Sequence, residues 1–164
     1  MKYGDIIIDS DDENWSIFKS VFDERIIGKK QLIFVVENDE GEKFGIYLNT
    51  EISNEYNKYI SIEKQSFEFI IETNRRLDKM MKFDLKDKQN GYTLYDKYND
   101  KLIQLGTVVL FKKTLNTMSH FSTLKEEYQG KENALCGNTR YKREEGEFII
   151  EYFTPLRLQV IQMK

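Results

Sequence analysis

Residues 31–48 contain the pattern that most constrains how this chain can fold. An apolar run at 32–36 is followed by Asn-Asp-Glu-Gly at 38–41 and by a second run, Phe-Gly-Ile-Tyr, at 44–47. Two apolar runs joined by a short segment of Asn, Asp and Gly are typical of a β-hairpin. The sequence therefore predicts two antiparallel strands, at 31–37 and 43–48.

Other short apolar runs also have the length and spacing of β-strands. We expect strands at 66–72, 81–85, 92–95, 102–111, 147–153 and 156–163. Phe67, Phe69 and Ile71 alternate along the first of these and share one face. This pattern predicts that Phe67 and Phe69 serve core and cross-strand packing.

Glycines mark two further points along the chain. Asn90-Gly91 favours a tight turn. We expect this turn to connect the strand at 81–85 to the strand at 92–95, so that the two form a hairpin. Gly106 interrupts the run at 102–111, which we expect to include one strand. Residues 50–60 fit either a short helix or an irregular connection.

The N-terminal region has the features of a helix. Ser10 and Glu13 have the spacing of a capping box, in which a hydroxyl and a carboxylate satisfy the first backbone N–H groups. Trp15, Phe18 and Phe22 then follow at helical spacing. We expect an amphipathic helix over 12–24 that ends near Gly28.

Together these elements define a fold class. About eight strands, few helices and no βαβ rhythm predict a mainly β protein (α+β by strict count). The ten tyrosines and eleven phenylalanines favour strands further. We expect a two-sheet antiparallel β-sandwich with an N-terminal amphipathic helix. Because there is no repeat or linker, residues 1–164 are expected to form a single domain.

Net charge and cysteine content indicate which partners and which cellular compartment suit this chain. The net charge of −3 makes nucleic acid an unfavourable partner, since phosphate binding requires a basic surplus. The single cysteine excludes an intramolecular disulfide and suits a reducing compartment. Neither a signal-peptide core nor an apolar run of about 20 residues is present. We expect a cytoplasmic protein that is small enough to reach the nucleus.

The sequence contains no assembled catalytic or metal-binding motif. The acidic run at 9–14 departs from a calcium loop at its sixth and twelfth positions, Asn14 and Ser20. His120 is the single histidine, and Ser119 beside it does not form a triad, which needs a third, orienting group. We expect His120 to lie in a loop region. We therefore expect a protein that is not an enzyme and that uses no cofactor or metal.

Two segments are candidates for other chemistry. Cys136 is either a small buried hydrophobic residue or, if exposed with a lowered pKa, a redox thiol. The densest basic segment is a candidate contact for acidic partners or lipid headgroups, although a solvated connection also explains it. Its residues are Arg75, Arg76, Lys79 and Lys82.

Along almost its whole length the chain resembles the TLDc domain of oxidation-resistance proteins. The hairpin segment 39–47 is similar to the family's "dG-x-vFG-x-y" pattern, and 66–69 is similar to its "sFLF" strand. The positions that match the family's structural pattern are Phe44, Gly45, Phe67, Phe69, Gly106 and Gly137.

The resemblance implies a central β-sandwich without an established catalytic constellation. It also implies a role in resistance to oxidative stress and binding to a subunit of the vacuolar proton-pumping ATPase. The first hypothesis is therefore a non-catalytic protein-interaction domain. The alternatives are a protein that acts on peroxide through Cys136 and a stress-responsive nucleic-acid-binding regulator, which the acidic net charge disfavours.

Overall fold

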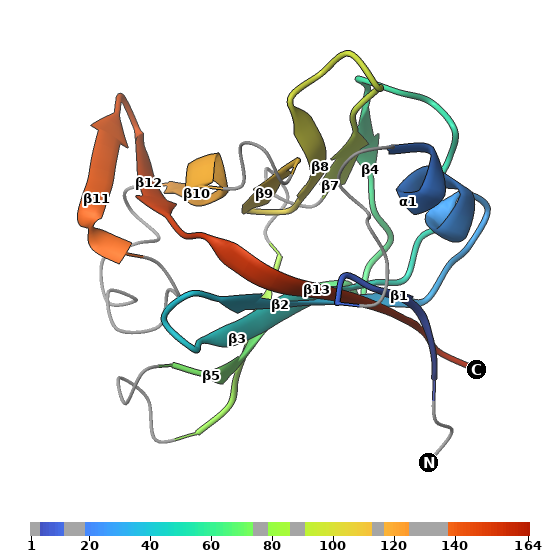
Figure 1. Cartoon of the computed structure of the whole chain (residues 1–164), viewed down its shortest axis with the longest axis horizontal. Coiled ribbons are helices and arrows are strands. Elements are labelled where there is room, and N and C mark those ends of the chain that lie inside the picture. Colours follow the sequence, from blue (N-terminus) through green and yellow to red (C-terminus); the bar gives the residue numbers. More distant parts are fainter. Residues whose placement is uncertain (1–3, 12–18, 74–78, 86–90, 113–116, 125–137) are drawn as a thin grey trace.

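The strands of this protein build two antiparallel sheets, which form the two layers visible in Figure 1. The computed structural model describes residues 4–11, 19–73, 79–85, 91–112, 117–124 and 138–164. Within these residues the chain forms thirteen strands and one short helix. In chain order they are β1 (Asp5–Asp9), α1 (Lys19–Ile26), β2 (Leu32–Asn38), β3 (Lys43–Leu48), β4 (Tyr59–Ser61), β5 (Phe67–Glu72), β6 (Met81–Asp84), β7 (Gly91–Leu94), β8 (Lys101–Leu105), β9 (Val108–Phe111), β10 (His120–Leu124), β11 (Asn138–Glu145), β12 (Phe148–Tyr152) and β13 (Pro155–Gln162).

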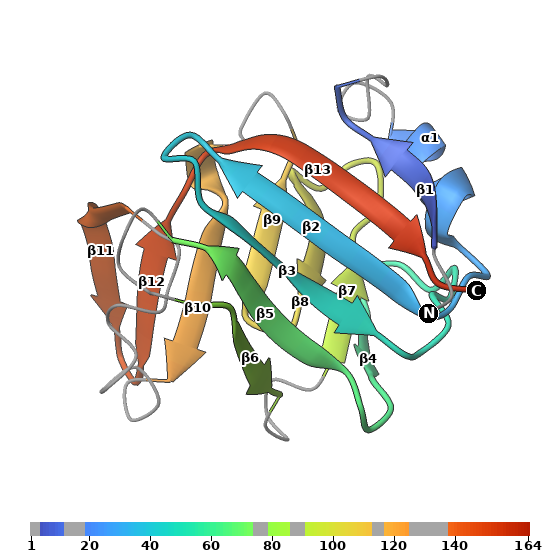
Figure 2. The same cartoon turned by 90° about the horizontal axis from the view of Figure 1, so that it is seen from below.

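The six-stranded sheet has the order β1-β13-β2-β3-β5-β6, and the seven-stranded sheet has the order β11-β12-β10-β9-β8-β7-β4. Figure 2 shows the six-stranded sheet in front of the other. The chain passes from one sheet to the other between β12 and β13, at Thr154-Pro155. The C-terminal strand β13 thus lies between β1 and β2, in the interior of the six-stranded sheet.

One hydrophobic core receives side chains from both sheets. Phe44 of β3 lies 4.7 Å from Phe121 of β10 and 4.9 Å from Phe153, measured between ring centroids. Tilted and edge-on ring pairs of this kind stabilise a core beyond the area that they bury. Phe44, which the sequence singled out as a structural position, therefore joins the two layers.

The predicted hairpin is confirmed as β2 and β3. Its turn is fixed by Asn38, whose Oδ1 accepts hydrogen bonds from the backbone N–H groups of Glu40 and Glu42. The Asn38 amide also donates to the buried Glu42 carboxylate at 2.8 Å. Gly41 adopts φ = 77°, a conformation that glycine accepts without strain.

Two predicted connections are wrong. The strands at 81–84 and 91–94 do not form a hairpin, because β6 pairs with β5 in one sheet while β7 pairs with β4 and β8 in the other. The run at 102–111 contains two strands rather than one. Gly106, with φ = 55°, turns the chain between β8 and β9. β1, β4, β10 and β11 were not predicted; residues 50–58 form the irregular connection that was one of the two expectations, and β4 begins at Tyr59.

The helical segment differs from its prediction at its start. α1 begins at Lys19, and residues 12–18 lie outside the described part of the chain. The helix ends at Ile26, just before Gly28, as expected. The Ser10 hydroxyl accepts a hydrogen bond from the Leu158 N–H on β13 at 2.8 Å. Glu13 of the predicted capping box lies outside the described residues.

Candidate protein-interaction face

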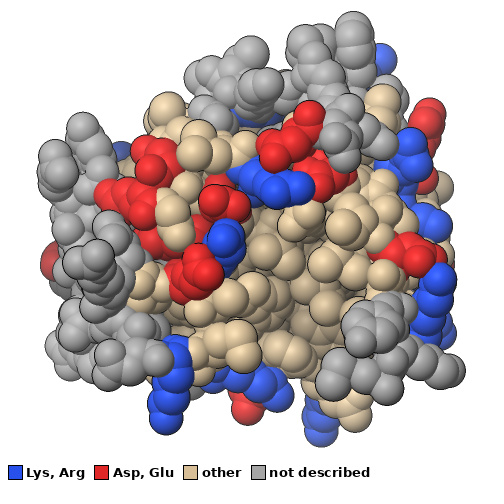
Figure 3. Space-filling model, turned by 60° about the horizontal axis from the view of Figure 1, so that its bottom comes forward, with Lys and Arg blue, Asp and Glu red and all other residues tan. Residues whose placement is uncertain are grey.

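The outer surface of the six-stranded sheet carries a contiguous group of apolar side chains. Strand register places two rows of side chains across this surface. One row contains Ile6, Ile161, Ile33, Tyr47 and Phe67, and the next contains Val35 and Phe69 beside Gly45. Ile6 is 57% exposed and the other six apolar side chains are half-buried. We call these seven apolar residues the outer apolar face, and Figure 3 shows uncharged side chains gathered over it.

The strand β5 is inverted relative to the sequence prediction. Phe67 and Phe69 point outward, whereas Ile70 is 4% exposed and faces the core. The register with β3 causes this, because Ile70 lies opposite the buried Phe44 and Phe69 lies opposite Gly45. The predicted core role of Phe67 and Phe69 is thus wrong, while their predicted cross-strand packing is confirmed.

Aromatic contacts hold the outward rings in place. Phe67 lies 5.3 Å from Tyr47 and 6.2 Å from Phe69, between ring centroids. Phe69 covers Gly45, where an added Cβ would meet the Phe69 Cζ at 2.7 Å and would also collide with the Phe34 carbonyl oxygen. Gly45 is therefore required for close packing of β2, β3 and β5.

One residue of the predicted basic segment reaches this face. The Lys82 Nζ lies 4.3 Å from the centroid of the Phe67 ring and 3.4 Å from the Asp84 carboxylate. A cation over an aromatic face is attracted by the ring quadrupole. Lys79 is exposed just before β6, and Arg75 and Arg76 lie outside the described residues.

Charged side chains border the outer apolar face at the end of the β2–β3 hairpin, and they are mainly acidic. Figure 3 shows this acidic cluster at its upper left. Apart from Glu42, whose carboxylate is buried in the hairpin, the described residues here carry six carboxylates and three cations. They are Asp9, Asp11, Glu37, Asp39, Glu40 and Glu72, with Lys43, Lys79 and Arg157. We call this the acidic end.

An ion-pair cluster on β1 and β13 organises the acidic end. Arg157 donates from Nε and a terminal nitrogen to the Asp9 carboxylate, at 3.0 and 2.6 Å, and Gln159 donates to it at 2.8 Å. The hydrogen bond from Arg157 is the largest of the effects that lower the pKa of Asp9 from 3.8 to about 2, against the opposing effect of burial. The same bond raises the pKa of Arg157. The Asp11 carboxylate lies 3.2 Å from the Arg157 Nε.

At the opposite end of the sheet, cations outnumber carboxylates. On or within three residues of the strand ends there, and apart from Glu68, which points between the sheets, the described residues carry five lysines and three carboxylates. They are Lys29, Lys30, Lys64, Lys82 and Lys164, with Asp5, Glu51 and Asp84. Lys164 pairs with Asp5 at 2.8 Å. We call this the basic end, so the outer apolar face lies between ends of opposite charge.

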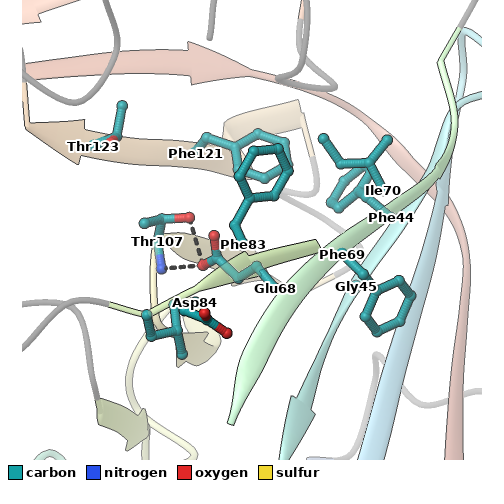
Figure 4. A pocket seen from close by; sticks show the side chains of 11 residues that line it. Phe44, Gly45, Glu68, Phe69, Ile70, Phe83, Asp84, Thr107, Phe121 and Thr123 are labelled. Atoms are coloured by element: carbon teal, nitrogen blue, oxygen red, sulfur yellow. Dashed lines mark hydrogen bonds between the residues drawn. The ribbon is translucent and has the colours of Figure 1, made fainter. Parts of the chain in front are cut away.

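A small pocket lies between the sheets, on the inner side of β5 (Figure 4). Glu68 projects into it, and its Oε1 accepts hydrogen bonds from the Thr107 N–H at 2.7 Å and from the Thr107 hydroxyl at 2.6 Å. The cavity volume is about 30 Å³, far below the roughly 300 Å³ at which sites for drug-sized ligands begin. Glu68 therefore connects β5 to the β8–β9 turn, and it was not recognised from the sequence.

His120 has a packing role in the seven-stranded sheet. It begins β10, contrary to the predicted loop, and lies 6.0 Å from Phe111 and 5.5 Å from Tyr152, between ring centroids. Its Nδ1 donates to the Met118 carbonyl at 2.8 Å. Burial is the main cause that lowers the pKa of His120. The neighbouring Ser119 accepts a hydrogen bond from the Phe111 N–H at 3.1 Å.

Two of the predicted positions, Cys136 and Gly137, lie outside the described residues, so the redox hypothesis stays a prediction. In the part of the chain that the structure describes, no three His, Cys, Asp or Glu side chains are grouped as metal ligands would be. None of the described helices is long and apolar enough to cross a membrane.

Comparison with known proteins adds no assignment. No family model matches the chain, and no curated protein matches it. The TLDc resemblance is therefore a hypothesis that rests on the residues quoted for it.

Proposed function

We propose that this chain is a non-catalytic protein-interaction module, a TLDc-like β-sandwich that binds a partner protein through the outer apolar face. The observation that carries the proposal is the outward orientation of Phe67 and Phe69. Aromatic residues are enriched at the energetic centres of protein interfaces. Contiguous apolar surface rimmed by polar residues is a common mark of such interfaces.

The charges at the rim specify the chemistry of the partner. A complementary protein surface has an apolar centre, with cations opposite the acidic end and carboxylates opposite the basic end. Complementary charge chiefly speeds association and fixes orientation, while the apolar centre supplies affinity. We propose a subunit of the vacuolar proton-pumping ATPase as the partner, in a role in resistance to oxidative stress, and the TLDc resemblance supports this choice.

Three described ionisable side chains, those of Asp9, Glu68 and His120, support a non-catalytic role because each forms a hydrogen bond within the fold. Asp9 is held by Arg157, Glu68 binds Thr107, and the His120 ring nitrogen donates to a backbone carbonyl. The first two contacts join segments of the fold that are far apart in the chain, and the third holds the His120 ring against its own segment. These structural roles account for the positions of the three side chains without a reaction.

Affinity purification tests this proposal. The tagged chain is captured from cells under conditions that keep the ATPase assembled, and ATPase subunits are measured by quantitative mass spectrometry. We expect the wild type to recover a subunit and the Phe67→Ser/Phe69→Ser double variant to lose it. Replacing an aromatic residue at the centre of an interface costs about 2 kcal/mol or more, roughly a 30-fold loss of affinity.

Tyr98 provides the matched control, because it is 84% exposed in the β7–β8 connection of the other sheet. Tyr98→Ser removes a surface aromatic ring that lies outside the outer apolar face and should leave recovery unchanged. Thermal unfolding of the three proteins checks that they are folded. Failure of the wild type to recover any ATPase subunit would exclude this partner, and equal recovery by both variants would exclude this face.

A further inference from the structure

The outer apolar face has a charge pattern that complements itself. Consider a twofold axis that lies in the plane of this face and runs across the strands, between the two apolar rows. Rotation about this axis places the acidic end of one copy over the basic end of a second copy. The same operation places the row with Val35 and Phe69 over the row with Ile33, Tyr47 and Phe67. Symmetric contacts of this kind bring one patch against itself.

The complementarity holds along individual strands. On β2, Glu37 lies near the acidic end and Lys30 precedes the strand at the basic end. On β5, Glu72 ends the strand and Lys64 precedes it. The operation therefore sets Glu37 opposite Lys30 and Glu72 opposite Lys64. On the edge strand β6, Lys82 and the terminal Asp84 exchange places in the same way.

The geometry points to a reversible homodimer, and we propose that the outer apolar face binds a second copy of this chain in this antiparallel arrangement. Reversing the strand direction keeps the strands of the two sheets aligned, and aligned sheets pack face to face within about 30° of each other. This inference uses the same face as the proposed function, so self-association and partner binding compete for it.

The size of the face predicts a weak dimer. Six strands span about 24 Å at about 4.8 Å per spacing, and seven residues along β2 span about 23 Å. The projected area is roughly 550 Å² per copy, below the roughly 800 Å² per partner of a standard stable interface. We expect a dissociation constant on the order of 10–100 µM, so dilution or a tighter partner frees the face.

Sedimentation equilibrium with charge-exchange variants tests the dimer. One variant reverses the acidic end (Glu37→Lys/Glu72→Lys) and the other reverses the basic end (Lys30→Glu/Lys64→Glu). Each alone places like charges opposite each other and should weaken self-association at least tenfold. An equimolar mixture restores opposite charges at both ends and should associate at least as tightly as the wild type.

Three results would overturn the proposal. A wild type that stays monomeric up to about 1 mM would show that the dimer does not form. Variants that dimerise like the wild type would show that the charged ends do not contribute to association. A mixture that stays monomeric would exclude the antiparallel arrangement. Lys97→Glu, in the β7–β8 connection, is the control and should not change the association.

The outcomes separate this proposal from the proposed function. A monomeric wild type that still recovers ATPase subunits through Phe67 and Phe69 refutes self-association alone. A dimer that follows the charge-exchange pattern without recovery of any subunit refutes the ATPase partner alone.

Discussion

Replacing Asp9 by Asn removes the carboxylate that anchors Arg157 at the acidic end of the outer apolar face. The wild-type carboxylate receives two hydrogen bonds from Arg157 and one from Gln159. These contacts join β1 to β13, which is the single neighbour of β1 among the described strands. The substitution keeps the size of the side chain and removes its charge, so its effect reports on the ion pair.

The altered pKa gives the size of the effect. The pKa of Asp9 falls from 3.8 to about 2, chiefly because Arg157 donates to the ionised form. A change of about two units corresponds to about 2.5 kcal/mol. The Arg157 side chain is 39% exposed, however, and solvent screens the pair. We therefore expect Asp9→Asn to lower the free energy of unfolding by about 1 kcal/mol at pH 7.

The pH dependence has a definite sign. Because the pKa of Asp9 is lower in the folded state, the unfolded state binds more protons at acidic pH. The contribution of the ion pair is complete above pH 3.8 and is lost as the pH falls towards about 2. The difference in stability between wild type and Asp9→Asn should therefore shrink over this range.

Urea unfolding at a series of pH values from about 7 to about 2.5 measures this difference. Asp84→Asn is the control, because Asp84 also pairs with a cation but its side chain is 88% exposed. We expect the control to change the stability little at any pH. A difference between wild type and Asp9→Asn that is absent at pH 7, or that stays constant down to pH 2.5, would refute the reasoning.

Three further predictions concern Gly45, Glu68 and His120. Gly45→Ala should lower the free energy of unfolding by roughly 3 kcal/mol in urea titrations, because its Cβ would collide with the Phe34 carbonyl oxygen; a loss below about 0.5 kcal/mol would contradict this. Glu68→Ala should cost about 1.5–3 kcal/mol by leaving Thr107 without its acceptor, whereas Glu68→Gln, which keeps an acceptor, should cost less; equal losses would show that the hydrogen bonds are unimportant. The pKa of His120, measured as its NMR titration midpoint, should lie below 6.5 because the ring is buried. Since protonation then favours the unfolded state, the free energy of unfolding should decline as the pH falls below 6.5. A midpoint at or above 6.5 would contradict the effect of burial.

Local sequence patterns were sufficient for part of the fold. The hairpin of β2 and β3 was predicted correctly because its two apolar runs and its Asn-Asp-Glu-Gly turn lie within a few residues. The strands β12 and β13 were also recognised, since Thr154-Pro155 separates two segments rich in apolar residues. The sequence marked Gly45 as a position of the family's structural pattern, and the close approach of Phe34 and Phe69 supplies the physical reason for a glycine there.

The candidate face was harder to predict, because its signal in the sequence points the wrong way. Phe67, Phe69 and Ile71 alternate as a core-facing row would, and Ile70 looks like the exception. The structure places Ile70 in the core and the phenylalanines outside. The presence of Glu68 between them on the inner side was a missed sign that this strand has a polar group to satisfy internally.

Local patterns in the sequence were enough to show that this chain is rich in β-strands, where several of them begin and end, and which turn closes the β2–β3 hairpin. These properties depend on short apolar runs and on turn residues that are close in the chain. The sheet that each strand joins and the buried face of β5 became known from the three-dimensional structure. Both depend on pairing between distant segments, as in the contact between Asp9 and Arg157, 148 residues apart. A shift of one residue in that pairing exchanges the two faces of a strand, so the outer apolar face exists because of strand register.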